Sequence, residues 1–327
     1  QIFFHNFGNW DAGHFLAIAQ NGYTSREQYA FFPLYPLLIS LLNEVGFNIL
    51  AAGMVLSFIF TALDLIFLVK LLKLDFSESI VQKTLIFLLI FPASFYLFLP
   101  YSESLFLLLA VLSFYFYKKR NYPLSFLFAS LSSITRLAGL AVILALWADA
   151  VFKDKKLLKN KQKFIIFLAP LGFLAFCLFL KIKTGDPLYF LIAERDWQRI
   201  LSIPGISIAD TLLKVFTPNA LDNNPSLLIN LLFTVLGLGL SIRTLIKLNF
   251  SYGIYSLASV AIPVLSTSLT SMTRFLLAAF PIFINLALIE EKYRSNLSKA
   301  VFLIFKFFCV LLLIVYLISF FNGYGVS

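Results

Sequence analysis

The sequence predicts an all-α polytopic membrane protein, a bundle of about ten transmembrane helices. Of its 327 residues, 60% are hydrophobic and 13% are charged, whereas a soluble domain is about half apolar and about a quarter charged. The apolar runs are continuous rather than alternating, which indicates helices and not the strands of a barrel. Because lipid offers the backbone no hydrogen bonds, helices also satisfy the chain internally.

Ten apolar segments are candidate spans, although several are shorter than the roughly 20 residues that a full crossing needs. Helices packed inside a bundle or broken around a cavity can be shorter. Residues 30–42 are not counted, because Pro33 and Pro36 suit an interfacial or re-entrant element better than a straight span. The candidate spans are residues 50–72, 85–99, 104–117, 123–135, 137–152, 164–180, 226–248, 252–269, 275–289 and 300–321.

The basic residues predict the orientation in the membrane. Short basic loops are typical of the cytoplasmic side, so the net charge of +10 indicates orientation and not nucleic-acid binding. Most lysines and arginines lie at 70–83, 118–120, 153–163, 243–247 and 292–299.

The remaining connections then face away from the cytoplasm. We expect a single transmembrane domain, 1–327, in which residues 1–49 form the first outer loop and interfacial helices. Residues 181–225 form a long outer loop, and tighter outer turns lie at 100–104, at Arg136 and at 271–274.

The first outer loop concentrates the polar chemistry of the chain. Its segment 4–23 carries both histidines, His5 and His14, beside Trp10 and Asp11. Asp11 is a candidate general base held at the membrane surface, and Trp10 a platform for a sugar or lipid. An ordinary wet loop with an interfacial aromatic anchor is an alternative. A metal site of Asp11, His5 and His14 is another, but the spacing matches no specific pattern, so we predict no metal and no cofactor.

Two arginines lie at outer turns between apolar helices. An arginine near membrane depth usually has a partner, and its planar fork suits phosphate oxygens. Arg136 and Arg274 are therefore candidate ligands of a lipid phosphate, with snorkelling or pairing with a structural acid as the alternative. Glu103 is a further outward-facing acid. The acids and aromatics of 184–199 are candidates for an acceptor sugar or for capping a short helix.

These motifs resemble the PIG-V family, the GPI mannosyltransferases that add the second mannose and their prokaryotic relatives. The resemblance follows the family's order over most of the chain. It rests on residues 10–23, 30–38, 100–106, 133–139, 185–187 with Trp197, and 273–275 with Pro281.

The resemblance implies a C-type glycosyltransferase architecture, a polyprenyl- or dolichyl-phosphate mannose donor, and one helix preceding Gln1. In such enzymes an acid in the first outer loop is catalytic, which corresponds to Asp11. The composition, rich in Phe, Ile and Lys, indicates a prokaryotic plasma membrane protein, or an ER membrane protein if the source is eukaryotic. The active site is expected on the non-cytoplasmic face. The GPI acceptor is not carried over.

We therefore predict transfer of mannose, with inversion, from a lipid-phosphate donor to a glycan or glycolipid acceptor. Asp11 is the expected base, and the expected substrate-binding residues are Trp10, His14, Glu103, Arg136 and Arg274. The expected partners are the donor, the acceptor and membrane lipids, and not nucleic acid.

The alternative is a transporter or flippase of a lipid-linked sugar, for which Asp64 is the main acid inside a candidate span. A non-catalytic scaffold subunit explains the apolar helices but not the first-loop cluster.

Overall fold

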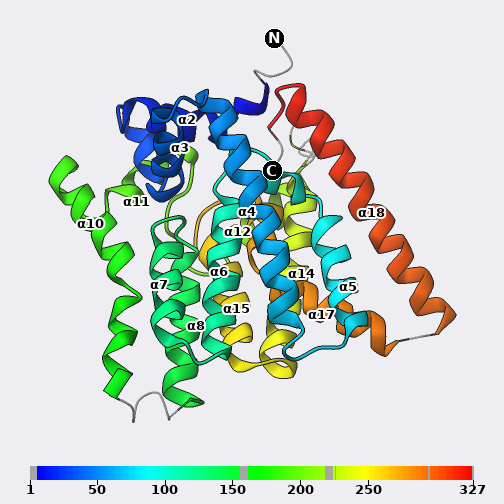
Figure 1. Ribbon diagram of the computed structural model, residues 1–327. Helices are drawn as coiled ribbons and strands as arrows, with labels where there is room; N and C mark the ends of the chain where they lie inside the picture. The colour runs from blue at the N-terminus through cyan, green and yellow to red at the C-terminus, as the bar shows by residue number, and fades with distance from the viewer. Residues whose placement is uncertain (1–5, 155–160, 218–223, 225, 294, 326–327) are drawn as a thin grey trace. The chain divides into compact units, whose positions relative to one another are not determined.

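The computed structural model describes residues 6–154, 161–217, 224, 226–293 and 295–325. Within these ranges the chain forms helices and turns, with no β-strand beyond an isolated bridge between Leu201 and Ser266 (Figure 1). It divides into two compact units, Gln1–Leu71 with Tyr96–Ile200 and Leu72–Phe95 with Leu201–Ser327. The predicted all-α class is confirmed.

The first unit carries the residues of the first outer loop and the turn at Arg136. Its elements, where η marks a 3-10 helix, are η1 (Asn6–Gly8), α2 (Asp11–Asn21), η2 (Arg26–Ala30), α3 (Leu34–Glu44), α4 (Ile49–Leu72), α6 (Glu103–Lys118), α7 (Tyr122–Ser133), α8 (Gly139–Phe152), η4 (Lys161–Leu168), α10 (Leu171–Thr184), α11 (Tyr189–Ala193) and η5 (Glu194–Trp197).

Helix α4 exposes apolar side chains on one face and buries polar ones on the other. Phe58, Ile59 and Ile66 recur at helical spacing on one face and are about half exposed, as expected of a surface that meets lipid. The opposite face buries Ser57 and Thr61, whose polar groups find partners inside the unit. The Thr61 hydroxyl donates to the carbonyl of Leu97 at 2.6 Å, so no hydroxyl on this face needs water.

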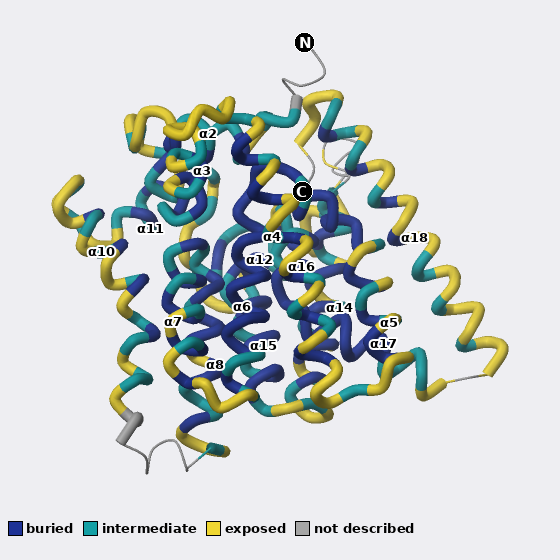
Figure 2. Tube along the Cα trace, in the orientation of Figure 1, coloured by how far each residue is buried: buried dark blue, intermediate teal, exposed yellow. Residues whose placement is uncertain are grey.

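Small residues bring the helices of the first unit close together. Ser113 of α6 and Ser125 of α7 exchange hydrogen bonds, each hydroxyl donating to the other residue's carbonyl at 2.8 Å. The amide of Gly172 donates to the hydroxyl of Ser130 at 2.8 Å, joining α10 to α7. Such contacts are typical of membrane helices, which lack a hydrophobic driving force toward one another. Helix α6 is buried over nearly its whole length (Figure 2).

The second unit is also helical and is held by buried polar contacts. The side-chain amide of Asn285 donates to the carbonyl of Leu240 and the hydroxyl of Thr244, both at 3.0 Å. Its elements are α5 (Glu78–Leu89), α12 (Ile206–Val215), α14 (Ser226–Lys247), α15 (Phe250–Val264), α16 (Met272–Ala278), α17 (Pro281–Lys292) and α18 (Asn296–Phe321), with η3 (Ser94–Phe98) at the boundary of the two units.

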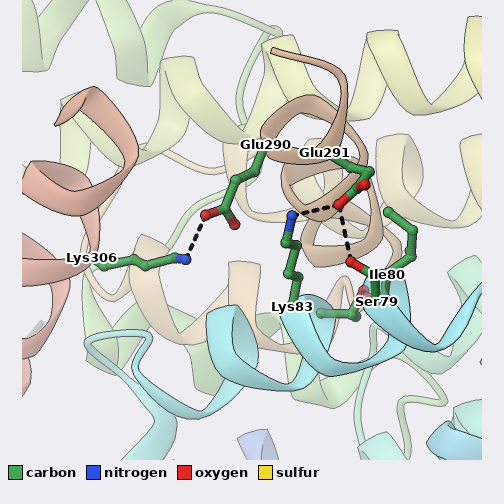
Figure 3. Close-up of polar contacts among 7 residues, drawn as sticks. Ser79, Ile80, Lys83, Glu290, Glu291 and Lys306 are labelled. Carbon is green, nitrogen blue, oxygen red and sulfur yellow. Dashed lines mark hydrogen bonds and ion pairs between the residues drawn. The ribbon is translucent and has the colours of Figure 1, made fainter. Parts of the chain in front are cut away.

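Ion pairs join three helices at the C-terminal end of α17 (Figure 3). Lys83 of α5 contacts the carboxylate of Glu291 at 2.6 Å, and the same carboxylate accepts a hydrogen bond from Ser79 at 3.0 Å. The neighbouring Glu290 holds Lys306 of α18 at 2.7 Å. All four charged side chains are about a quarter exposed or less, so water screens these pairs less than surface pairs.

Four helices within the described ranges are long and apolar enough to cross a membrane. They are α4 (Ile49–Leu72), the segment Phe164–Thr184 that contains most of η4 and all of α10, α14 (Ser226–Lys247) and α18 (Asn296–Phe321). The bent pair of α16 and α17 makes a fifth span if it counts as one. The other expected spans form shorter helices. Residues 30–42 contain α3, of only 11 residues, which agrees with the prediction that they do not cross.

Two expected spans differ from the structure for the same reason. Residues 85–99 were expected to form one helix, but α5 ends at Leu89, before Pro92. Residues 275–289 were expected to be continuous, but α16 and α17 meet at 84° and Pro281 opens α17. Proline lacks the N–H that continues a helix and favours its first turn, so each break follows from the sequence.

Candidate active site

Asp11 is the first residue of α2, where unpaired backbone N–H groups and the helix dipole favour a carboxylate. Trp10 precedes it with φ 58° and ψ −132°, a backbone conformation that residues other than glycine rarely adopt. Trp10 is 48% exposed, so packing does not explain this conformation. Strain of this kind clusters at functional sites. The strained residue therefore presents the predicted platform beside the predicted base.

The position of α2 is fixed by apolar packing on its inner face. Phe15 and Ile18 are buried, and the cluster they belong to includes Tyr35 of α3, Leu56 of α4 and Leu105 of α6. Asp11 precedes Phe15 and Ile18 by four and seven residues, so it lies on the same face of α2, one turn before the packed side chains. The predicted base is therefore held by a rigid element.

The turn that precedes α6 contacts the first loop directly. The hydroxyl of Tyr101 donates to the carbonyl of Asn9 at 3.1 Å, two residues before Asp11. Pro100 packs so closely on Gly53 of α4 that a Cβ added there would lie 2.7 Å from the proline ring. A side chain at 53 would therefore push the turn away from α4.

The same turn holds Arg136. Glu103 Oε1 lies 2.6 Å from Arg136 Nη1, with side-chain exposures of 3% and 13%. The same nitrogen donates to the hydroxyl of Ser102 at 3.1 Å. Arg136 lies between α7 and α8 in a tight connection, in which the amide of Gly139 donates to the Arg136 carbonyl at 2.9 Å. A side chain at Gly139 would clash with the backbone of Ser132, so glycine is needed for this turn.

Tyr35 of α3 is fully buried and is close enough to Glu103 to be influenced by its charge. Burial raises the pKa of its hydroxyl; the hydrogen bond with Ser57 opposes this, and the charge of Glu103 adds to it. The hydroxyl is 2.7 Å from Ser57 and donates to the carbonyl of Gly53 at 3.0 Å. Tyr35 is therefore a neutral structural donor and not a proton acceptor.

His14 joins the first loop to the long loop. Its ring stacks on Phe31 at 5.0 Å and meets the edge of Trp197 at 5.1 Å. Arg26 adds an ion pair with Asp196 at 3.2 Å. The expected substrate role of His14 is untested by these contacts, which show that it packs among aromatic rings.

The other expected site residues lie elsewhere. Arg274 is in the second unit, in the first turn of α16, where its amide donates to the carbonyl of Ser271 at 2.9 Å. His5 lies outside the described residues. No group of three His, Cys, Asp or Glu side chains that could hold a metal ion is found among the residues that are described.

Sequence reasoning missed Tyr101, Ser102 and the pairing of Trp197 with His14 as parts of this region. It named the turn 100–104 but assigned a role to Glu103 alone. The signal was present, because Tyr101, Ser102 and Trp197 all belong to motifs on which the family resemblance rests. Tyr101 and Trp197 join the first loop to distant parts of the chain, and such partners are not visible from local spacing.

Comparison with known proteins identifies the family. The chain is 34% identical over 136 residues to GPI mannosyltransferase 2 of Schizosaccharomyces pombe, a match that covers 40% of this chain and 29% of that protein. The chain thus spans less than a third of this relative's length in the match. No solved structure matches. The family model for mannosyltransferase (PIG-V) matches residues 1–186, more than half of the chain. The resemblance found in the sequence is confirmed: this integral membrane protein belongs to the PIG-V family of mannosyltransferases.

Proposed function

We propose that this protein transfers mannose from a polyprenyl- or dolichyl-phosphate donor to a hydroxyl of a glycan or glycolipid acceptor, with inversion at the anomeric carbon. One observation carries the proposal. The 100–104 turn joins the loop that presents Asp11, through Tyr101, to the guanidinium of Arg136, through Glu103. A carboxylate and a phosphate-binding cation are thus held by one rigid connection in a protein of the mannosyltransferase family.

Asp11 acts as the general base in this proposal. Its carboxylate takes the proton of the acceptor hydroxyl while the acceptor oxygen bonds to the anomeric carbon. The bond from that carbon to the phosphate oxygen breaks, and its electron pair leaves with the lipid phosphate. Direct displacement converts a β-linked donor to an α-mannoside. One carboxylate is enough, unlike the paired acids of most glycoside hydrolases, because phosphate is a good leaving group.

Arg136 binds the phosphate and stabilises the charge that develops on it. Its Nη1 forms an ion pair with Glu103 and donates a hydrogen bond to Ser102, and within the described residues these are the polar contacts of its guanidinium. Nε and Nη2 can therefore donate to phosphate oxygens. Arg274 is a second proposed phosphate ligand on the basis of its position in the sequence. Trp10 is the proposed stacking platform for a sugar.

Substitution of the base tests this proposal. The complete protein in detergent is incubated with radiolabelled polyprenyl-phosphate mannose and a panel of glycan acceptors. Asp11→Asn is expected to lower kcat by about 10²–10⁴, the usual contribution of a general base. Asp210→Asn is the matched control, since Asp210 is an exposed partner of Lys214 on α12. Full transfer by folded Asp11→Asn would show that Asp11 is not the base.

One observation favours the alternative of a carrier for a lipid-linked sugar. Asp64 is 1% exposed inside α4, and neither carboxylate oxygen has a hydrogen-bond partner among the described residues. Acids at membrane depth are common on transport pathways. Movement of labelled donor across proteoliposomes without any transfer, lost in Asp64→Asn, would favour the carrier over the enzyme.

A further inference from the structure

The charge of Glu103 has a consequence for the phosphate that the proposed site binds. Glu103 is 3% exposed and Arg136 is 13% exposed, so solvent screens their interaction little. The carboxylate lies on the Nη1 side of the guanidinium, which leaves the other nitrogens for a ligand. A phosphate that binds there meets a pair with no net charge instead of an isolated cation.

The reaction changes the charge of that phosphate. The donor is a phosphodiester, which carries one negative charge. Breaking its bond to the sugar leaves a phosphomonoester, which carries nearly two negative charges at neutral pH because its second pKa is about 6. A buried cation without a counter-ion would attract this product more strongly than the donor, and the enzyme would be inhibited by the lipid that it releases.

We propose that Glu103 balances the charge of Arg136 so that the released lipid phosphate does not bind more tightly than the donor. The inference rests on the proposed function, since it requires Arg136 to contact the phosphate. Glu103 acts through Arg136 and does not touch the sugar, so it is a positioning residue that determines selectivity between donor and product. The direct substrate contact expected of Glu103 from the sequence stays a prediction, and this proposal gives the residue an indirect role instead.

Glu103→Gln tests the role of the charge. Glutamine has nearly the same shape and keeps an oxygen for Nη1, but it leaves Arg136 positive. The expected result is a fall of about tenfold or more in the ratio of the inhibition constant of polyprenyl phosphate to the KM of the donor. Ser102→Ala is the matched control, because it removes the other bond of Nη1 without a change of charge. Its ratio is expected to stay at the wild-type value.

An unchanged ratio in folded, active Glu103→Gln would overturn the inference. Because removal of one buried partner can prevent folding, a second measurement keeps Glu103 and Arg136 and uses Arg274→Gln, which removes the charge of the second proposed phosphate ligand. Polyprenyl phosphate and its methyl diester are compared as inhibitors. We expect their inhibition constants to agree within about threefold, since a neutral pair gives no advantage to the second charge. A preference of more than about tenfold for the monoester would contradict the proposal.

The double variant Glu103→Gln with Arg136→Gln separates this inference from the proposed function. It leaves no buried charge in the pair, so folding is retained more easily than in either single variant. If Arg136 binds the phosphate, the KM of the donor rises. An unchanged donor KM and kcat would remove Arg136 from the site and refute the proposed phosphate role. A raised KM together with an unchanged ratio in Glu103→Gln would refute only the charge balance by Glu103.

Discussion

Replacement of Arg136 by glutamine is expected to destabilise the protein strongly, because it leaves the carboxylate of Glu103 buried without its counter-ion. Two unit charges about 4 Å apart attract by about 4 kcal/mol at the effective dielectric constant of roughly 20 that describes protein sites. Breaking a buried pair by removing one partner accordingly costs about 3–5 kcal/mol. Adding Glu103→Gln removes the stranded charge, so the double variant should recover most of this loss.

The assay is equilibrium unfolding in mixed micelles for the wild type, both single variants and the double variant. The control is an ion pair with the same distance and different burial. Lys214 and Asp210 also lie 2.6 Å apart, but their side chains are 57% and 43% exposed. Asp210→Asn is expected to change the free energy of unfolding by less than about 1 kcal/mol. A double variant as unstable as Arg136→Gln would refute the reasoning, since the stranded charge would then not be the cause.

Two further predictions concern packing and pH. Gly172→Ala should destabilise the protein by about 1–3 kcal/mol, because its Cβ would clash with the carbonyl of Ser130. Gly239→Ala meets open space and should be neutral or stabilising. Thermal unfolding compares the two variants, and equal effects would contradict the packing argument. Burial lowers the pKa of Lys118 from 10.5 to about 8, against the opposing charge of Asp149. Between these pH values the unfolded chain binds more protons, so stability should rise with pH across this window. Lys118→Met should reduce that rise, and an unaltered profile would refute the assignment.

Much of this architecture could be predicted from the sequence because lipid imposes simple rules. Continuous apolar segments had to be helical, and prolines marked the segment that forms the short helix α3. The family could be predicted from short motifs, and the match of the family model to residues 1–186 confirms it. The breaks at Pro92 and Pro281 were visible in the sequence, but hydropathy alone favoured unbroken spans.

Side-chain pairing was much harder to predict. The sequence left open whether Arg136 faces a phosphate or pairs with a structural acid, and the structure shows the acid, Glu103. Ser102 and Arg136 are 34 positions apart, and nothing in their local spacing indicates that they meet. Such contacts depend on how α6 and α7 pack, which small residues decide over many turns. The roles of Asp11, Arg136 and Arg274 in catalysis stay predictions for the same reason.

Trp10 offers a test of whether strain is retained for function. Its φ of 58° and ψ of −132° are easy for glycine and unfavourable for any residue with a Cβ. Trp10→Gly and Trp10→Ala both remove the indole, but only glycine also relieves the backbone. Glycine should therefore be more stable than alanine by about 1 kcal/mol, measured by thermal unfolding, while both variants lose mannose transfer.

Comparing the two variants separates the backbone from the side chain. If glycine and alanine are equally stable, the conformation is not strained and the inference from the backbone fails. If both retain full transfer, the indole is not the sugar platform, whatever its effect on stability. A more stable but inactive Trp10→Gly would mean that tryptophan is kept at this position against its conformational preference. The reason would then have to be a ligand, because a tryptophan that is 48% exposed gains little from the protein's own packing.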